Sequence, residues 1–392
     1  MIFRQISSKI VELCKVYPAI TLTGPRQSGK TTLVKSLFED YAYVNLENPD
    51  IREAAEEDPR RFLSRYKDKG VVIDEAQRVP ELFSYLQQIL DESGKMGKFI
   101  LTGSQNFLLF EKITQSLAGR VAIFHLFPFT QSELEDTDNL AGDIDLALFK
   151  GGYPVIYDRS LAPTDYFPSY IQTYVERDVR TISNIENLGL FQRFLRLCAG
   201  RTGQLFNASS VGNDLGVSYK TVQSWLSILE TSFIVFRLAP HFANFRKRIV
   251  KQPKLFFYDT GLLCSLLGIS TEDQLNSHYM RGNIFESYII SEYVKNQAHL
   301  VKPNNCFFWR DSQGHEIDLL LEFAREFKAI EIKSGQTISN SFFSGLRYFK
   351  ELSGGSDKSS FLVYGGEEET KRTHGKVVSW NQLTKLLREL GH

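Results

Sequence analysis

The feature that most constrains the fold is a run that fits the pattern G-x-x-x-x-G-K-[ST]: Gly24-Pro25-Arg26-Gln27-Ser28-Gly29-Lys30-Thr31-Thr32. In this pattern the glycines let a loop close around phosphates, the lysine reaches them and the hydroxyl binds Mg²⁺. The flanking residues predict a buried strand over 19–23 and a helix over 32–38. Backbone N–H groups and the helix dipole would then converge on phosphates, so we predict a nucleoside triphosphate site. A glycine-rich turn without a ligand is the alternative.

Residues 1–130 alternate between predicted strands and helices, which indicates a parallel sheet covered on both faces. Further strands are predicted over 41–46, 70–75, 98–106 and 120–126. The strand over 70–75 ends in Asp74 and Glu75, and the C-terminal ends of parallel strands line the site edge of such a sheet. We expect Asp74 to hold Mg²⁺, directly or through water, and Glu75 to polarise the attacking water. An acidic turn leading into solvent is the alternative.

The next strand also ends in polar side chains. Ser104 and Gln105 follow the apolar residues of the run 98–106. On a parallel sheet these groups would lie beside the γ-phosphate. We therefore expect Ser104 or Gln105 to sense whether that phosphate is present.

Composition excludes several classes of protein. At 392 residues the chain is too long for one ordinary core, so two or three domains are expected. Basic and acidic residues both number 46, so affinity for nucleic acid would have to come from a local patch. The four cysteines lie far apart without a C-x-x-C pair, which argues against a zinc site or a disulfide framework. The sequence has neither a signal peptide nor an apolar run of 18 residues, so we expect a cytoplasmic protein without membrane contact.

Seven runs spread over nearly the whole chain resemble one family. They are Gly24–Thr32, Ile73–Leu82, Leu101–Gln105, Ser116–Val121, Gly151–Pro154, Tyr174–Val179 and Tyr258–Leu262. They resemble the prokaryotic AAA-type ATPases that are fused to a C-terminal domain of unknown function. The resemblance implies ATP binding and hydrolysis but supplies no substrate.

A site of the AAA type usually borrows an arginine, which neutralises charge in the transition state. The candidates are Arg120, Arg177 and Arg180. Arg120 follows a glycine at the start of a predicted strand and is assigned as a finger or sensor. Arg177 and Arg180 share a predicted helix with Glu176 and Asp178, which favours a salt-bridged helix face instead.

The middle of the chain begins with an acidic run, Glu133–Asp145, which we interpret as a solvated linker. Helices are then predicted over 190–198, over 209–215 and from the capping residue Ser218 through Glu230. Helix, glycine-containing turn and helix make the order of a helix-turn-helix. Predicted strands over 233–238 and 254–258 would complete a winged helix.

The segment between those two strands, His241–Lys254, contains five Lys or Arg residues and no acid. Positive charge at a wing tip is suited to contact with a phosphate backbone, so DNA or RNA is a possible partner. The groove-facing residues would be Tyr219, Lys220, Thr221, Gln223 and Ser224. Winged helices also dock proteins or serve as lids, so a protein partner stays open.

The C-terminal residues predict a helix from Asn283, strands over 306–310, 316–321 and 327–333, a helix from Phe342 and a strand over 361–364. Glu331 and Lys333 are two apart on one strand and point to the same face. If Asp318 faces them, two carboxylates can share a divalent metal while the ammonium orients a water or steadies the leaving phosphate.

This arrangement resembles the PD-(D/E)xK nuclease fold. The resemblance places Asp318, Glu331 and Lys333 at the positions of the nuclease motif and Glu286 at its helix-borne acid. The proline that precedes the aspartate in the motif is missing here. An inactive binding fold is the alternative.

We therefore predict an α/β protein of three parts. These are an AAA-type P-loop ATPase domain over 1–135, a helical and winged-helix domain over 136–275 and a nuclease-like domain over 276–392. The leading hypothesis is an ATPase with Mg²⁺ that switches the other two parts, with its two motifs at the ends of adjacent strands. The alternatives are a metal-dependent nuclease regulated by ATP, and a non-enzymatic module that binds nucleic acid or protein. The oligomeric state stays open.

The residues assigned to these roles form two sets. The catalytic set is Lys30, Glu75, Ser104, Arg120, Asp318, Glu331 and Lys333. The metal-binding set is Thr31, Asp74, Glu286, Asp318 and Glu331.

Overall fold

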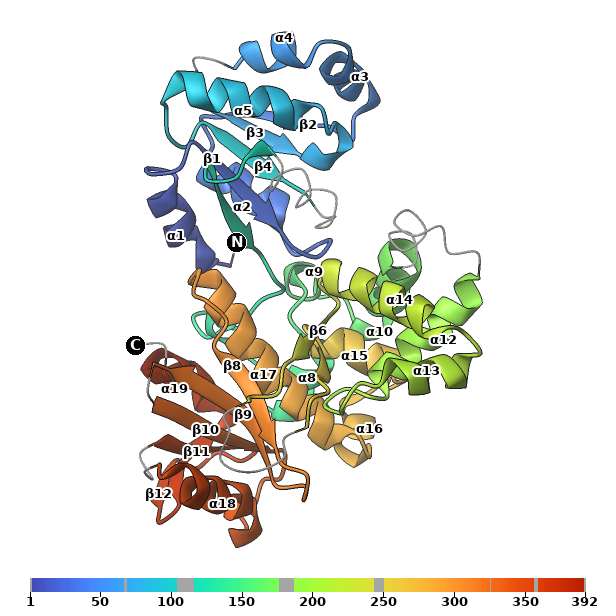
Figure 1. The fold of residues 1–392 in the computed structure, drawn as a ribbon, viewed down its shortest axis with the longest axis vertical. Coiled ribbons are helices and arrows are strands. Elements are labelled where there is room, and N and C mark those ends of the chain that lie inside the picture. Colours follow the sequence, from blue (N-terminus) through green and yellow to red (C-terminus); the bar gives the residue numbers. More distant parts are fainter. Residues whose placement is uncertain are drawn as a thin grey trace.

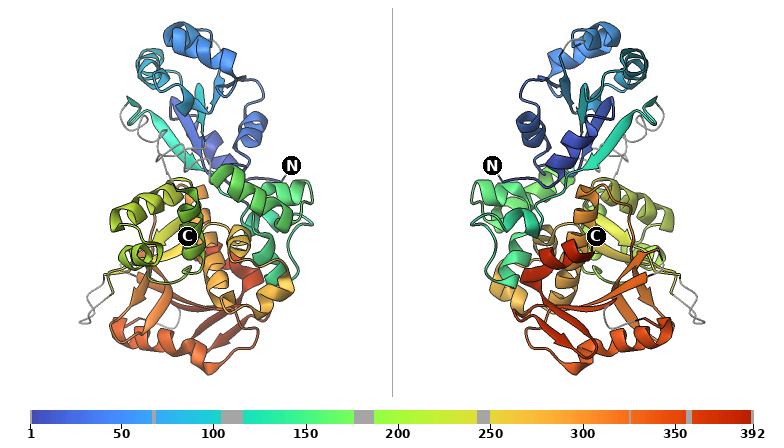
Figure 2. Two further views of the ribbon diagram at one scale, coloured as in Figure 1. Left: turned by 90° about the vertical axis from the view of Figure 1, so that its right-hand side faces the viewer. Right: turned by 90° about the vertical axis from the view of Figure 1, so that its left-hand side faces the viewer.

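The computed structural model describes residues 2–66, 69–103, 116–175, 187–242, 250–324, 326–355 and 359–390. The N-terminal part (blue) and the C-terminal part (orange to red) lie at opposite ends of the molecule, and the green and yellow middle part flanks their junction (Figures 1 and 2). Among the described residues, no helix has the length and apolar character that crossing a bilayer requires.

The N-terminal part is built on a five-stranded parallel sheet with the order β2-β3-β4-β1-β5. Its strands are β1 Ala19–Thr23, β2 Ala42–Asn45, β3 Val71–Asp74, β4 Phe99–Thr102 and β5 Val121–His125. The predicted parallel α/β domain is confirmed. The expectation that the two nucleotide motifs end adjacent strands is wrong, because β4 lies between β1 and β3.

Helices cover both faces of this sheet because their apolar stripes pack on its buried side chains. One face carries α1 Ile6–Leu13 and α2 Lys30–Leu37, and the other carries α3 Pro49–Glu57, α4 Pro59–Ser64 and α5 Leu82–Ser93. The three central strands β3, β4 and β1 are buried along their whole length, as expected for a sheet covered on both sides, whereas most residues of the edge strands β2 and β5 are only half-buried.

The middle part is mainly helical. Its elements are α7 Gln131–Leu134, α8 Ile144–Lys150, α9 Pro154–Asp158, α10 Pro163–Tyr170, α12 Leu188–Ala199, α13 Ala208–Leu215, α14 Tyr219–Thr231, β6 Val235–Leu238, β7 Lys254–Phe257, α15 Thr260–Leu266 and α16 Glu272–Ser277. The side chain of Ser218 accepts a hydrogen bond from the Thr221 amide and caps α14, as predicted. Strands β6 and β7 form an antiparallel hairpin.

The C-terminal part contains a six-stranded mixed sheet with the order β12-β13-β11-β10-β9-β8. Its elements are α17 Arg281–His299, β8 Cys306–Arg310, β9 Glu316–Phe323, β10 Glu326–Lys333, α18 Ser344–Ser353, β11 Ser360–Tyr364, β12 Thr370–Arg372, β13 Gly375–Ser379 and α19 Leu383–Leu390. Helices α17 and α19 pack on one face and α18 on the other. The sequence did not predict β12, β13 or α19.

The acidic run Glu133–Asp145 is exposed at Asp136, Asp138 and Asp143, but its two ends are not solvated as its composition suggested. Glu133 is only 4% exposed and Asp145 only 5%. Glu133 completes a capping box with Thr130 at the start of α7, and Asp145 pairs with Arg281 of α17 through contacts of 2.7 and 3.0 Å. Composition misled here because the balancing cations lie far away in the sequence.

The hairpin of the middle part is docked on the C-terminal sheet through backbone hydrogen bonds. The His241 amide donates to the Phe308 carbonyl at 2.7 Å, and the Phe308 amide donates to the Ala239 carbonyl at 3.1 Å. Farther along, the Val250 amide donates to the Arg310 carbonyl at 3.2 Å. These bonds satisfy part of the edge strand β8 and join the two parts of the molecule.

Candidate functional site

The glycine-rich loop connects β1 to α2, as its motif requires. Gly24 has φ +147° and a Cβ there would overlap the Leu126 carbonyl, so only glycine fits. Gly29 adopts the left-handed region immediately before α2 begins. Lys30 is only 7% exposed, and its Nζ donates to the carbonyls of Gly24 (3.0 Å) and Pro25 (2.8 Å). The lysine ammonium is therefore folded into the loop.

Asp74, the last residue of β3, lies beside the phosphate loop. Thr31 Oγ1 donates to Asp74 Oδ2 at 2.8 Å, and Tyr43 OH donates to the same oxygen at 2.6 Å. Thr102, at the end of the intervening strand β4, donates to Asp74 Oδ1. Burial, followed by the hydrogen bond to Asp74, raises the pKa of Tyr43. Three strands and α2 thus hold the carboxylate in one place.

Glu75 follows Asp74 in a left-handed backbone conformation, with φ +55°. This conformation costs a non-glycine residue about 1–2 kcal/mol. The half-buried side chain accepts a hydrogen bond from Gln77 Nε2, with Oε2 at 2.5 Å. The turn Ala76–Arg78 and Gln77 together hold the orientation of Glu75.

Arg120 lies at the wrong end of the sheet for its assigned role. Its carbonyl accepts from the amide of Ala19, the first residue of β1, whereas the phosphate loop follows the last residue of that strand. The Arg120 guanidinium instead pairs with Asp91 at 2.5 and 2.9 Å. The prediction of a sensor in the same chain's site is therefore wrong. Ser104, Gln105, Arg177 and Arg180 lie outside the described residues.

Arg4 contacts the phosphate loop through the Ser28 carbonyl. The sequence analysis did not identify Arg4, because a single arginine forms no recognisable pattern. It is 5% exposed, and its Nη1 donates to the Ser28 carbonyl at 3.0 Å. Its Nε bonds Glu133 Oε1 at 3.1 Å, and its Nη2 bonds the Phe127 carbonyl at 2.5 Å. Burial opposes ionisation of Glu133. The charge of Arg4, together with His299 and two backbone amides, outweighs this effect and holds the pKa of Glu133 below its usual value.

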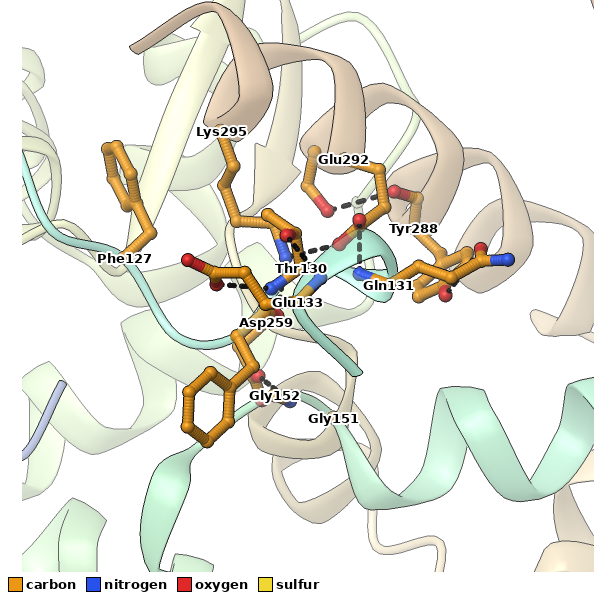
Figure 3. A network of polar contacts seen from close by, with 12 residues as sticks. Phe127, Thr130, Gln131, Glu133, Gly151, Gly152, Asp259, Tyr288, Glu292 and Lys295 are labelled. Atoms are coloured by element: carbon orange, nitrogen blue, oxygen red, sulfur yellow. Dashed lines mark hydrogen bonds and ion pairs between the residues drawn. The ribbon is translucent and has the colours of Figure 1, made fainter. Parts of the chain in front are cut away.

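Helix α17 is hydrogen-bonded to the segment 127–134 (Figure 3). Arg4 contacts the same segment. Glu292 Oε2 accepts from the Gln131 amide at 2.7 Å, and Tyr288 OH donates to Gln131 Oε1 at 3.1 Å. Lys295 Nζ donates to the Phe129 carbonyl at 3.3 Å and pairs with Glu292 at 2.5 Å. A continuous set of polar contacts therefore runs from the phosphate loop to the helix of the C-terminal part.

The predicted C-terminal cluster is brought together by β9 and β10. Their register pairs Ile330 with Leu319, which places Glu331 beside Asp318. Lys333 Nζ lies 2.7 Å from Glu331 Oε2 and 3.1 Å from Asp318 Oδ2. Burial and the neighbouring Asp318 raise the pKa of Glu331 well above its usual value. A carboxylate pair with one lysine is therefore present where the sequence predicted it.

Glu286 of α17 joins this cluster, together with two residues that were not assigned to it. Lys254 Nζ bonds Glu286 Oε1 at 2.8 Å and also pairs with Glu316. Oxygen atoms of Glu286, Glu316 and Asp318 lie within 4.8 Å of one another, a spacing that would let the three carboxylates share one metal ion. Burial raises the pKa of Glu286 to about 7. A cavity of about 690 Å³ adjoins these side chains.

Lys254 was predicted to contact phosphates as part of the basic wing. It is only 3% exposed and holds the carboxylates just described, so this part of the prediction is wrong. The wing tip 243–249 lies outside the described residues. Tyr219, Lys220 and Ser224 of α14 are exposed, while Thr221 and Gln223 are half-buried.

Family models match the chain in three places. An AAA domain covers residues 16–135, a domain of unknown function (DUF8612) covers 141–273 and another (DUF4143) covers 281–383. Uncharacterized proteins of Mycobacterium tuberculosis and Mycobacterium bovis are each 33% identical over 339 residues, which is 84% of this chain and 74% of theirs. The chain belongs to their family. This chain itself carries an AAA domain followed by a C-terminal domain of unknown function, as the sequence resemblance predicted.

Solved structures with similar folds are more distant. A Walker-type ATPase of Pyrococcus abyssi is 16% identical, with 68% of this chain and 96% of that chain covered and a TM-score of 0.46. RuvB of Thermotoga maritima is also 16% identical, with 59% and 88% covered and a TM-score of 0.31. At this distance they add nothing to the account of the site.

The buried histidine at the end of α17 predicts a pH dependence of stability. His299 Nδ1 lies 3.9 Å from Glu133, and burial lowers the pKa of His299 to about 4 from 6.5. Between pH 7 and pH 5 the unfolded chain takes up this proton and the folded protein does not. Lowering the pH from 7 to 5 should therefore reduce the free energy of unfolding by about 2 kcal/mol through His299.

Urea denaturation of His299→Gln at pH 7 and pH 5 should show a correspondingly smaller loss of stability than the parent protein. His278→Gln, at a half-buried position, is the matched control and should keep the parent dependence. An unchanged dependence in His299→Gln would show that His299 titrates normally in the folded protein.

Proposed function

We propose that this protein binds ATP with Mg²⁺ at the Gly24–Thr32 loop and hydrolyses it. The observation that carries the proposal is the 2.8 Å hydrogen bond between Thr31 Oγ1 and Asp74 Oδ2, which joins the two motifs across an intervening strand. A hydroxyl and a carboxylate are oxygen ligands suited to Mg²⁺, so Thr31 and Asp74 would hold the ion. When bound, the ion neutralises charge on the phosphate oxygens. The match to an AAA domain supports ATP as the nucleotide.

The chain's own groups suit the remaining tasks. Lys30 would exchange the carbonyls of Gly24 and Pro25 for phosphate oxygens, which accept hydrogen bonds from an ammonium more strongly because they are charged. Ser28 Oγ is buried without a hydrogen-bond partner among the described residues, so a phosphate oxygen could satisfy it. Glu75, held by Gln77, would orient the attacking water and accept its proton.

Replacing Glu75 tests the assigned chemistry. Glu75→Gln keeps the size and the polar contacts but cannot accept a proton, so steady-state phosphate release should fall at least about 100-fold. Titration with a fluorescent ATP analogue should show affinity within about threefold of the parent, since substrate binding does not use this carboxylate. Glu81→Gln, at an exposed position nearby, is the control and should hydrolyse ATP at the parent rate. Parent-like turnover by Glu75→Gln would refute the role of Glu75.

We further propose that nucleotide state reaches the C-terminal part through Arg4, the segment 127–134 and α17. Arg4 bonds a carbonyl of the phosphate loop, so closure of the loop on phosphates would act on it directly. Helix α17 has 19 residues and is therefore about 28 Å long. It carries His299 beside Glu133 at one end and Glu286 in the carboxylate cluster near the other. One rigid element thus contacts both sites.

Hydrogen exchange can test this connection. In a Glu75→Gln background, ATP should change the exchange protection of the α17 amides, and adding Arg4→Met should abolish that change while ATP still binds. Removing Arg4 alone leaves Glu133 buried and unpaired, which costs about 3–5 kcal/mol. The charge-balanced pair Arg4→Met with Glu133→Gln therefore serves as the second variant. An undiminished response of α17 in that pair would contradict the route.

A second candidate function is metal-dependent cleavage of DNA or RNA. The contact of Lys333 Nζ with both Asp318 and Glu331 favours it, because this is the arrangement the motif requires. Gly345 supports it as well, because only a residue without a Cβ leaves room at this position for the Glu331 carboxylate. The exposed residues of α14 could contact a nucleic acid in a winged-helix manner.

Incubation of DNA and RNA with Mg²⁺ or Mn²⁺, with and without ATP, tests this candidate. Asp318→Ala and Lys333→Ala should each abolish any cleavage, while Lys376→Ala at the surface should leave it unchanged. Cleavage that persists in both pocket variants would come from another source, and this candidate would then be wrong.

A further inference from the structure

The carboxylate pocket of the C-terminal part contains a cation that comes from a different part of the chain. Lys254 begins β7 of the middle part, and its ammonium is inserted between Glu286 of α17 and Glu316 of β9. Only 3% of the residue is exposed. A buried ammonium requires several partners, and Lys254 finds carboxylates on two separate elements.

The charges in the pocket divide into two groups. Lys333 forms ion pairs with Asp318 and Glu331. Lys254 forms ion pairs with Glu286 and Glu316, and Arg310 makes a longer contact of 3.3 Å with Glu316. Among the described residues, Lys254 is therefore the cation in direct contact with Glu286.

A divalent ion would need two carboxylates with which Lys254 is already paired. The three carboxylates whose oxygen atoms approach one another are Glu286, Glu316 and Asp318, and Lys254 is bonded to two of them. Metal–oxygen distances in such sites are about 2.0–2.6 Å, so an ammonium and a metal ion could not occupy the centre together. The adjoining cavity is lined by Lys254 itself, which gives its side chain space into which it could withdraw.

We propose that Lys254 is the resident cation of this pocket and that it competes with divalent metal for Glu286 and Glu316. The middle part thereby keeps the C-terminal site closed to metal until Lys254 withdraws. The use of the site for cleavage rests on the second function proposed above, but the competition for the carboxylates does not.

Manganese binding to the nucleotide-free full chain tests the competition directly. We would titrate Mn²⁺ and follow the free ion by electron paramagnetic resonance, with Asp74→Asn in every variant so that the AAA domain contributes no site. Lys254→Met should bind Mn²⁺ at least about tenfold more tightly than the parent. The gain should disappear when Glu286→Gln is added. Lys376→Met, which removes a lysine paired with Glu389 at the surface, is the matched control and should show no gain.

Equal Mn²⁺ affinity in the parent and Lys254→Met would overturn the inference. If Lys254→Met does not fold, the charge-balanced Lys254→Met with Glu316→Gln carries the test. It retains Glu286 and Asp318, so it should still bind Mn²⁺ more tightly than the parent, and failure to do so would also overturn the inference. Tighter Mn²⁺ binding without cleavage of DNA or RNA would leave the inference standing and remove the nuclease candidate.

Discussion

The arrangement of the molecule depends on the buried ion pair between Arg4 and Glu133. A charged group in a protein interior is costly unless it is paired and its remaining donors are satisfied. Arg4 meets this requirement with Glu133 and with the carbonyls of Ser28 and Phe127. The requirement fixes three separate segments against one another: the N-terminus, the phosphate loop and the chain that leaves β5. Helix α17 then binds the last of these segments through Glu292 and Lys295.

The middle part and the C-terminal part are also joined by buried ion pairs. Lys254 of the middle part is buried among carboxylates of the C-terminal part, as Arg4 is buried beside a carboxylate of another segment. Such pairs add little net stability compared with apolar packing. Separating or removing one partner is nevertheless strongly destabilising, because it leaves an uncompensated buried charge. The parts of this protein are therefore held in one specific arrangement, and any motion between them has to provide new partners for these charges.

Much of the fold followed from local patterns. Buried strands, the glycine-rich loop and the cap at Ser218 depend on neighbouring residues, and all were predicted near their observed positions. The cluster of Asp318, Glu331 and Lys333 was also predictable, because side chains two apart on a strand share a face. The role of Arg120 in the same chain's site and the solvated character of Glu133 and Asp145 were predicted wrongly. The pairing of Lys254 with carboxylates was missed.

The sequence by itself determined the phosphate loop, the acids that end β3 and the carboxylate–lysine cluster, because each depends on spacing within one strand or turn. Only the tertiary structure decided that β4 separates the two nucleotide motifs and that Arg120 lies at the opposite edge of the sheet. It also decided which charges are paired. Arg4 and Glu133 are 129 residues apart, and Lys254 and Glu286 are 32 apart. Contacts of this kind depend on sheet order and on the docking of whole elements, which leave no periodic signal in the sequence.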